Sequence, residues 1–172
     1  AVDDGETKIP CPGGGQGCFD DLELVDPEPY NAQQLEWISN HLGQLNDLLH
    51  AQPIGDYQSM IDVPSFVDHY LINEISRDVD AYIRSHFMHK DRDGLVKAGP
   101  IWDYNFALGN VAEETTGWQY IDGRNGSNDW HRIMGPDPAF HAQLVARYQE
   151  LRQGILSDAS LHARVDSVSA PL

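Results

Sequence analysis

Four side chains between residues 78 and 105 have the chemistry of an oxygen-rich metal site. Asp78 and Asp80 lie two residues apart in ISRDVDAYIRS, and Asp103 and Asn105 lie two residues apart in AGPIWDYNFALGN. Carboxylate and amide oxygens are ligands for Mg²⁺, Mn²⁺ or Ca²⁺ rather than for Zn²⁺. Carboxylates held together repel one another unless a cation lies between them. The residue types therefore predict a divalent cation between the two segments, provided that the fold brings them together.

A β-hairpin predicted between the two acidic pairs would return the chain and bring them together. Residues 85–98 contain two short strand-like runs around the DRDG sequence of residues 91–94, and Asp-Gly between short strands is a hairpin signal. The DRDG sequence also resembles the start of a calcium-binding loop, but no Glu follows at the required spacing, so we interpret it as a turn. Asp103 follows the second strand, and we expect Trp102 to pack in the core beside it.

Helices are expected to carry these segments. Leucine and isoleucine residues at steps of three and four predict a helix over residues 31–51. Asp62 is a good N-cap for a second helix, and its expected apolar face contains Phe66, Val67, Tyr70, Leu71 and Ile75. A third helix is expected from Pro138, and a fourth covers residues 158–168. The expected buried stripe of the third helix contains Phe140, Leu144, Val145, Tyr148, Leu151 and Ile155.

Residues 111–136 are polar and glycine-rich, so we expect a loop there. Three aromatic residues in this segment suggest that the loop packs down onto the core: Trp118, Tyr120 and Trp130. The sum of the patterns is an α+β fold that is mostly α-helical and contains one small hairpin.

The first 30 residues are expected to form an irregular arm that is rich in proline and glycine. Within it, residues 19–25 fit either a short strand or an extended segment. The arm carries the two cysteines of the chain, Cys11 and Cys18, which are too few for a four-ligand zinc site. The glycines of CPGGGQGC would allow a Cys11–Cys18 disulfide and hence an oxidising compartment; the alternative is two free thiols in a loose arm.

The charge balance excludes one large class of partner. The chain has 172 residues, with 27 Asp and Glu against 11 Lys and Arg, and its formal net charge is −16. Such a surface repels nucleic acid and attracts divalent cations and basic partners, although it is also compatible with simple solubility. The sequence contains no run long and apolar enough for a membrane span. It also begins without a secretory leader, so we expect either a processed chain or an internal piece of a longer one.

The order of these parts has a precedent in enzymes of phosphoryl transfer. Protein kinases place a catalytic Asp in a loop, follow it with a short hairpin, and end that hairpin in the metal-binding Asp of an Asp-Phe-Gly sequence. Here Asp80, the hairpin at 85–98 and Asp103 follow one another, and Asp103-Tyr104-Asn105 takes the place of Asp-Phe-Gly. From spacing alone, carboxylates that cap helices and turns remain the commoner interpretation.

A longer motif strengthens the kinase interpretation. The run SFVDHYLINEISRDVDAYIRSHFMHKDRDGLVKAGPIWDYNFALGN, residues 65–110, resembles the signature of the CotH family of atypical secreted protein kinases. The later NDWHRIMGPDPAFHAQLVARYQELR is similar to further segments of that family. The resemblance is strongest over residues 60–172, and it implies that residues 31–172 form a kinase C-lobe with the hairpin next to the metal site. It further implies ATP with Mg²⁺ or Mn²⁺ as the ligand and protein Ser/Thr hydroxyls as the acceptor.

The resemblance assigns expected roles to individual residues. Asp80 matches the catalytic-loop Asp of the family, and Asp103 matches the Asp that binds the metal on the ATP phosphates. Asn105 aligns with an Asp or Asn and is a candidate metal contact. Asp78 stands where the family usually has Asn, which adds charge to the site. Ser85 lies where an ordinary kinase has a metal-binding Asn, and serine is a poorer ligand.

Other polar residues near these motifs have weaker assignments. Arg84 and Lys97 are the nearest cations to the acidic residues, and each could contact a nucleotide phosphate or pair with a surface acid. Glu74 is a candidate for orienting a site residue from the second helix. His86 and His89 point to opposite sides of a strand and cannot share a metal, so we interpret them as ordinary hairpin residues.

The N-terminal part of the chain does not fit a kinase N-lobe. Lys8 is the only lysine in the first 60 residues, and residues 31–51 read as a helix rather than a sheet. A non-catalytic extracellular, coat or envelope binding module that keeps the C-lobe is therefore the alternative to a phosphotransferase. A third possibility is a domain stabilised by Ca²⁺. With the resemblance, the expected location is secreted or associated with the cell envelope or a coat.

Overall fold

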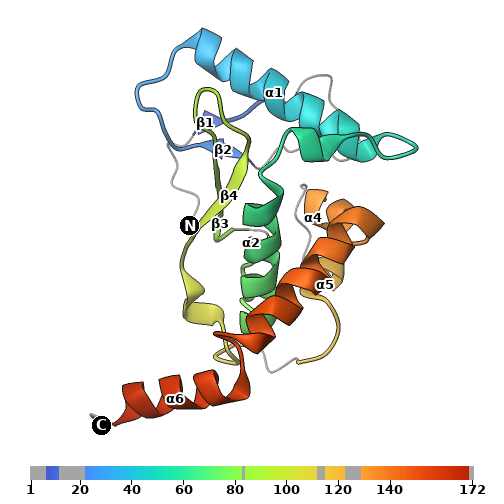
Figure 1. Cartoon of the computed structure of the whole chain (residues 1–172). Helices are drawn as coiled ribbons and strands as arrows, with labels where there is room; N and C mark the ends of the chain where they lie inside the picture. The colour runs from blue at the N-terminus through green and yellow to red at the C-terminus, as the bar shows by residue number, and fades with distance from the viewer. Residues whose placement is uncertain (1–6, 12–21, 83, 112–114, 123–128, 171–172) are drawn as a thin grey trace.

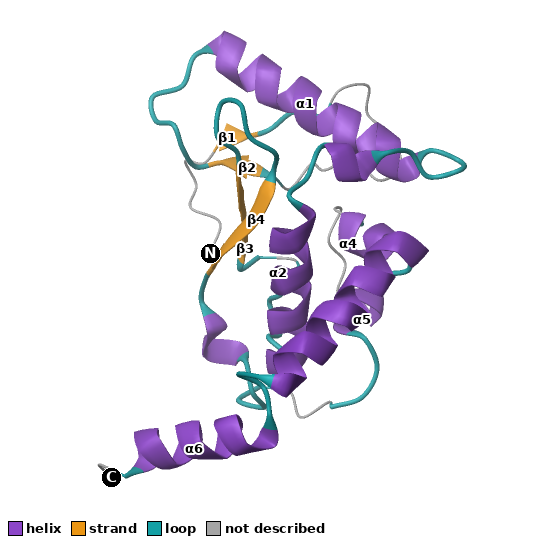
Figure 2. Ribbon diagram, viewed as in Figure 1, coloured by secondary structure: helices purple, strands orange, loops and turns teal. Residues whose placement is uncertain are grey.

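The computed structural model describes residues 7–11, 22–82, 84–111, 115–122 and 129–170. Helix α2 (Val63–Ser76) lies at the centre of the molecule. As Figure 1 shows, α5 (Pro138–Gln153) crosses beside α2, and the β3–β4 hairpin runs along the other side of α2. Helix α1 (Ala32–His50) lies across one end of this assembly. The predicted α+β class, mostly helical, is confirmed, and Figure 2 shows how little of the chain is strand.

The N-terminal arm contains one small antiparallel pair of strands. Strand β1 (Thr7–Lys8) pairs with β2 (Glu23–Leu24), so the strand predicted within residues 19–25 is present over two of those residues, and residues 19–21 lie outside the described part. Ile9 is buried and Cys11 is half-buried against the core. Cys18 lies outside the described residues, so the disulfide stays a prediction.

Helix α1 confirms the helix predicted over residues 31–51. Asn31 begins it through a capping box: its side chain accepts from the backbone N–H of Gln34, while the Gln34 side chain accepts from the backbone N–H of Asn31, both within 2.9 Å. Leu42, Leu45 and Leu49 form its buried face. The short 3₁₀ helix η1 (Tyr57–Ser59) follows and leads into α2.

Helix α2 begins at the predicted N-cap, where the Asp62 carboxylate accepts from the backbone N–H of Ser65 at 3.0 Å. Four of the five residues of its predicted apolar face are buried: Phe66, Val67, Tyr70 and Leu71. The expectation for Ile75 is wrong, because its side chain is 41% exposed. Ile75 lies in the last turn of α2, on the side away from the buried residues Asn73 and Ser76.

The hairpin is also confirmed. Strand β3 (His86–His89) pairs antiparallel with β4 (Lys97–Ile101), with His89 opposite Lys97 and His86 opposite Ile101. A bulge lies between His86 and Met88. Residues 91–94 form the predicted turn, which is closed by a hydrogen bond from the Gly94 N–H to the Asp91 carbonyl at 3.1 Å. Strand β4 extends beyond the predicted end at residue 98.

The segment predicted as a loop contains two short helices. Helix α3 (Gln119–Asp122) and helix α4 (Trp130–Met134) interrupt residues 111–136, so the prediction of a continuous loop is wrong. As expected, Tyr120 and Trp130 pack down and are buried, whereas Trp118 is 37% exposed. The Trp130 indole N–H also donates to the Asn46 side-chain oxygen at 2.8 Å, which ties α4 to α1.

Helix α5 begins at Asp137 and buries only part of the predicted stripe. Phe140 and Leu144 are buried and Leu151 is half-buried. Three members of the stripe are exposed instead: Val145, Tyr148 and Ile155. The reason is that α2 covers only one side of α5 and that α5 ends before Ile155. The final helix α6 (Asp158–Ser169) confirms the prediction for residues 158–168, is exposed along its whole length and projects from the body of the molecule (Figure 1).

Candidate active site

Asp103 lies where the chain leaves strand β4 and turns sharply. Its backbone has φ 57° and ψ 52°, in the left-handed region, and it is the N-cap of the 3₁₀ helix η2 (Tyr104–Phe106). Asp is one of the few non-glycine residues enriched in that conformation. The Asp103 side chain is exposed. Trp102 does not pack in the core as predicted: it is 60% exposed, and its ring makes an edge contact with Phe87, with ring centroids 5.9 Å apart.

Two backbone hydrogen bonds join the segment after Asp103 to the end of α2. The N–H of Leu108 donates to the Ser76 carbonyl at 2.6 Å, and the N–H of Val79 donates to the Phe106 carbonyl at 3.3 Å. Residues 76–79 and 106–108 therefore lie side by side. The hairpin returns the chain as expected, and it brings the segment of Asp103 to the segment that contains Asp78 and Asp80.

Asp78 is the most unusual carboxylate of this region. Its side chain is fully buried, and neither carboxylate oxygen has a hydrogen-bond partner among the described residues. Burial raises the pKa of Asp78 most, and the negative charges of Asp80 and Asp103 raise it further. The backbone N–H groups of Asp80 and Val79 lie near the carboxylate and lower the pKa, although neither has the geometry of a full hydrogen bond. The charges of Asp80 and Asp103 therefore both reach the carboxylate of Asp78.

The loop after α2 is closed by its own backbone. The N–H of Arg84 donates to the Asp80 carbonyl at 3.0 Å, and the N–H of Ala81 donates to the Asp78 carbonyl at 3.2 Å. Asp80 is half-buried, Ser85 is buried and Arg84 is exposed. The loop therefore presents the Asp80 carboxylate from a backbone that is fixed on both sides.

The two remaining candidates lie further out. Asn105 belongs to η2 and is exposed, and its backbone carbonyl accepts from the Asn110 side chain at 2.7 Å. Lys97 pairs with His89 at the turn side of the hairpin, four residues before Ile101. At the usual strand rise, Lys97 begins roughly 13 Å before the end of β4. The structure thus places Lys97 toward the turn and not beside Asp103.

Glu74 has an orienting role that the sequence only suggested. Its carboxylate accepts from the backbone N–H groups of Gln119 at 2.7 Å and Tyr120 at 3.0 Å, and from the hydroxyl of Tyr82 at 3.0 Å. The Gln119 side chain in turn donates to the Asp78 carbonyl. Glu74 therefore ties α3 and the loop of the acidic residues to α2.

Sequence reasoning missed a buried polar network next to Asp103. The Tyr104 hydroxyl donates to the Asn73 side-chain oxygen, and the Asn73 amide donates to Nδ1 of His69 at 3.1 Å. His69 stacks on His86, which we had interpreted as an ordinary hairpin residue, and His86 Nδ1 lies 3.1 Å from Nε2 of His131. Only the four-residue spacing of His69 and Asn73 on one helix face could have signalled part of this network.

Strained backbone is concentrated in the same region. Among the described residues, the non-glycine residues with positive φ are Arg77, Tyr82, Asp103 and Leu108. All of them lie within residues 77–108, the segment that contains the acidic residues. Because such conformations cost about 1 kcal/mol or more each and persist where the surroundings enforce them, their concentration is typical of a functional site.

The donor set fits a hard divalent cation, although no complete ligand cage is formed. In the part of the chain that the structure describes, no group of three or more His, Cys, Asp or Glu side chains is close enough to hold a metal ion. The buried, unpartnered oxygens of Asp78 and the exposed carboxylate of Asp103 are oxygen donors of the kind that Mg²⁺, Mn²⁺ and Ca²⁺ prefer. A cation between them would also relieve the repulsion that raises the pKa of Asp78.

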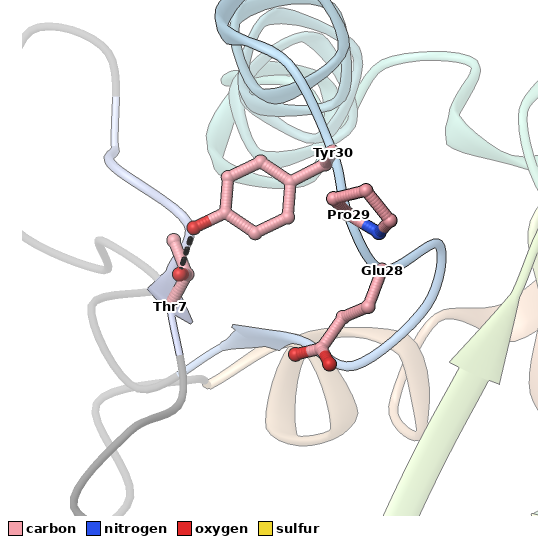
Figure 3. A pocket seen from close by; sticks show the side chains of 4 residues that line it. All are labelled: Thr7, Glu28, Pro29 and Tyr30. Carbon is pink, nitrogen blue, oxygen red and sulfur yellow. Dashed lines mark hydrogen bonds between the residues drawn. The ribbon is translucent and has the colours of Figure 1, made fainter.

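A shallow pocket lies elsewhere, against the N-terminal arm. It is lined by Thr7, Glu28, Pro29 and Tyr30, and Figure 3 shows the hydrogen bond between the Thr7 and Tyr30 hydroxyls at its edge. The turn of the hairpin approaches this end of the molecule, because the Lys90 ammonium lies 5.2 Å from the centre of the Trp37 ring of α1. The pocket, formed by β1 and the segment before α1, therefore lies toward the turn of the hairpin, whereas Asp103 follows the other end of the hairpin.

These features define a class of protein. A central helix, a loop that carries Asp80, a hairpin and an Asp at its end follow one another in a mostly helical α+β fold. Residues 20–172 match the family model described as CotH kinase protein, and this match covers most of the chain. The chain therefore belongs to the CotH kinase family. No curated protein matches the chain, and no solved structure does. None of the described helices is long and apolar enough to cross a membrane.

Proposed function

We propose that this chain is the lobe of a phosphotransferase that moves the γ-phosphoryl group of ATP to a Ser or Thr hydroxyl of a protein. The observation that carries the proposal is the buried carboxylate of Asp78, whose oxygens have no hydrogen-bond partner among the described residues and whose pKa is raised by burial and by the charges of Asp80 and Asp103. Family membership supports a kinase-like fold, and the segments of Asp80 and Asp103 are joined by backbone hydrogen bonds.

In this proposal, Asp103 holds Mg²⁺ or Mn²⁺ on the ATP phosphates, with Asp78 and Asn105 as further oxygen donors. The metal, when bound, would neutralise the charge that develops on the phosphate oxygens. Asp80 would accept the proton of the substrate hydroxyl while the oxygen forms a bond to the γ-phosphorus. The bond between the γ-phosphorus and the β–γ bridging oxygen breaks, and ADP leaves.

The proposed roles of two basic side chains and of Ser85 follow from their positions. Arg84 is exposed at the end of the loop that begins with Asp80, so it could contact a phosphate oxygen of a bound nucleotide. Lys97 is a weaker candidate, since it lies toward the turn of the hairpin. Ser85 is buried and would support the loop more than bind the metal.

Calorimetric titration of Mn²⁺-ATP tests the proposal, with Asp103→Ala, Asp80→Asn and the control Asp93→Asn. Asp93 is an exposed acid in the turn of the same hairpin. Asp103→Ala should weaken binding by about 100-fold or more, because loss of even an outer partner of a ligand costs roughly 10- to 100-fold. Asp80→Asn should keep the binding and reduce transfer of ³²P to a degenerate Ser/Thr peptide mixture by about 10²- to 10⁴-fold. Asp93→Asn should behave as wild type.

Equal loss of binding in Asp80→Asn and Asp103→Ala would contradict the separate roles. Absence of Mn²⁺-ATP binding by the wild-type chain would overturn the proposal for this chain. A titration with Ca²⁺ alone would then test the calcium-stabilised alternative, in which the cation raises the melting temperature and the nucleotide has no effect.

A second function is favoured by one observation. Exposed apolar side chains lie close to Asp103 in the sequence: Trp102, Phe106 and Leu108, of which Leu108 is 82% exposed. A module that binds a partner through this surface, in a coat, an envelope or another extracellular assembly, would keep the C-lobe without phosphoryl transfer. Binding of a partner that Asp103→Ala leaves intact would support this module over the enzyme. Either function is proposed for a secreted or coat-associated protein.

A further inference from the structure

We propose that Tyr104 and Asn73 are positioning residues that hold Asp103 in place through a hydrogen-bonded chain anchored in the core. The hydrogen bonds run from Tyr104 to Asn73 and on to His69. His69 stacks on His86, which lies within hydrogen-bond distance of His131, and we call these three residues the histidine cluster. The effect on metal-nucleotide binding rests on the function proposed above, whereas the effect on the conformation of Asp103 does not.

Tyr104 is the first link because it follows Asp103 directly and points the other way. Asp103 is exposed, whereas the Tyr104 side chain is half-buried and its hydroxyl donates to the Asn73 side-chain oxygen on α2. Burial and the nearby charge of Asp78 raise the pKa of Tyr104 to about 12, so its hydroxyl keeps the proton that it donates. Among the described residues, this is the side-chain hydrogen bond that joins η2 to α2.

Asn73 is the second link, and each end of its amide has a different partner. It is 2% exposed. Its oxygen accepts from Tyr104, its nitrogen donates to His69 Nδ1 at 3.1 Å, and its backbone carbonyl accepts from the Arg77 N–H at 2.9 Å where α2 ends. One end of the amide accepts and the other donates, so a flipped amide would have to reverse both side-chain hydrogen bonds, with the Tyr104 hydroxyl accepting and His69 Nδ1 donating. The position of Tyr104 is therefore fixed relative to the last turn of α2.

The histidine cluster connects this chain to three elements. His69 belongs to α2, His86 to β3 and His131 to α4. The ring centroids of His69 and His86 lie 4.4 Å apart, those of His86 and His131 lie 4.7 Å apart, and the Tyr70 hydroxyl donates to the His131 carbonyl at 2.6 Å. The anchor of Asn73 is thus held from several sides and cannot move without disturbing the core.

Asp103 depends on such an anchor because its own side chain does not cap the 3₁₀ helix that it begins. Its left-handed backbone must be enforced by neighbouring contacts. The backbone bonds of Phe106 and Leu108 to the end of α2 fix the far side of η2, and the Tyr104 hydroxyl fixes the near side. Loss of that hydroxyl should therefore loosen the turn at Asp103 more than the rest of the fold.

The test compares Tyr104→Phe with Tyr57→Phe. Tyr57 is a matched control because it is a buried tyrosine whose hydroxyl donates to the Asp137 carboxylate at 2.6 Å, in η1. Amide hydrogen exchange, read by mass spectrometry without metal or nucleotide, should become about fivefold faster over residues 103–108 in Tyr104→Phe only, as expected for one lost hydrogen bond. Asn73→Ala should give the same local change.

Mn²⁺-ATP affinity, measured well below the melting temperature, provides the second readout. It should fall about fivefold or more in Tyr104→Phe and should not change in Tyr57→Phe, because a purely structural loss does not alter the affinity of the molecules that remain folded. Unchanged exchange over residues 103–108 would overturn the positioning role. Faster exchange with unchanged Mn²⁺-ATP affinity would overturn the claim that the Tyr104 hydrogen bond supports nucleotide binding. If wild type binds no Mn²⁺-ATP, the proposed function fails, and the exchange experiment still decides the conformational role.

Discussion

Lowering the pH from 7 to 5 is expected to destabilise the fold through the histidine cluster. Burial lowers the pKa of His69 to about 4, and it lowers the pKa of His86 and His131 well below the ordinary value of 6.5. The folded state therefore keeps these rings neutral, whereas the unfolded chain protonates them below pH 6.5. Above pH 6.5 the three histidines are neutral in both states and do not reduce the free energy of unfolding. As the pH falls from 6.5 toward the folded pKa values, protonation of the unfolded chain lowers that free energy.

The size of the effect can be worked out for His69. With a pKa of about 4 in the folded state and 6.5 in the unfolded state, its contribution changes by about 2 kcal/mol between pH 7 and pH 5. His86 and His131 act in the same direction. Asp78 acts in the opposite direction, because its pKa is raised by burial and its folded form therefore takes up a proton more readily. Since a typical domain is stable by only 5–15 kcal/mol, a loss of about 2 kcal/mol from His69 alone is easily measured.

Urea denaturation at intervals of half a pH unit measures this dependence. The slope of the unfolding free energy against pH should grow below pH 6.5 by up to about 1.4 kcal/mol per pH unit for each histidine that binds a proton on unfolding. His86→Phe keeps an aromatic ring in place. Whatever its effect on stability at pH 7, it should reduce the slope below pH 6.5 by the contribution of one histidine. His162→Gln on the exposed helix α6 is the control and should keep the wild-type slope.

Two results would refute the reasoning. A free energy of unfolding that is constant between pH 7 and pH 5 would show that the three rings are not kept neutral by burial. An unchanged slope in His86→Phe would show that other groups cause the acid sensitivity. In either case the packing of the cluster would have to be reconsidered.

Two further substitutions test the polar contacts that hold the site. Glu74→Ala should destabilise the chain by about 2–4 kcal/mol, because the backbone N–H groups of Gln119 and Tyr120 lose their acceptor. Glu74→Gln keeps one acceptor oxygen and should cost less. Equal losses of stability in the two variants would contradict this account. Asp137→Ala should cost about 2–3 kcal/mol, since it removes both the N-cap of α5 and the acceptor of the Tyr57 hydroxyl. Urea denaturation checks both, and a loss below about 0.5 kcal/mol for Asp137→Ala would show that the cap is replaced by solvent.

The sequence was sufficient for the parts of the fold that depend on local signals. The capping residues Asn31 and Asp62 and the Asp-Gly turn of the hairpin were each recognisable, since each signal lies within a few residues of the structure that it causes. The approach of Asp103 to the loop of Asp78 and Asp80 followed from the same signals, because a hairpin must return the chain.

The parts that failed depend on tertiary packing. Ile75 and Trp102 are apolar and were expected inside, but no described element covers their exposed surfaces. Helices α3 and α4 contain four and five residues, too few for a periodic pattern, and packing of Tyr120 and Trp130 against distant helices holds them. Periodicity reports which residues share a face and does not report whether that face has a neighbour.

The missed part of the site has the same explanation. His69, His86 and His131 come from three elements and meet only in the folded chain, so no sequence spacing connects them. The hydroxyl of Tyr104 and the amide of Asn73 are 31 residues apart. The roles of Asp80, Asp103 and Asn105 remain predictions for the titration experiments described above.

The separations along the chain also bear on how the site is assembled during folding. The Tyr104–Asn73 bond closes a loop of 31 residues, whereas the Tyr57–Asp137 and Asn46–Trp130 bonds that attach the outer helices close loops of 80 and 84 residues. Loop-closure entropy makes the shorter loop less costly by about 0.8 kcal/mol. The acidic residues, the hairpin and the end of α2 therefore form a nearly contiguous unit of low contact order. We therefore expect helices α1, α4 and α5 to dock after this unit has formed, because their contacts close longer loops and cost more chain entropy.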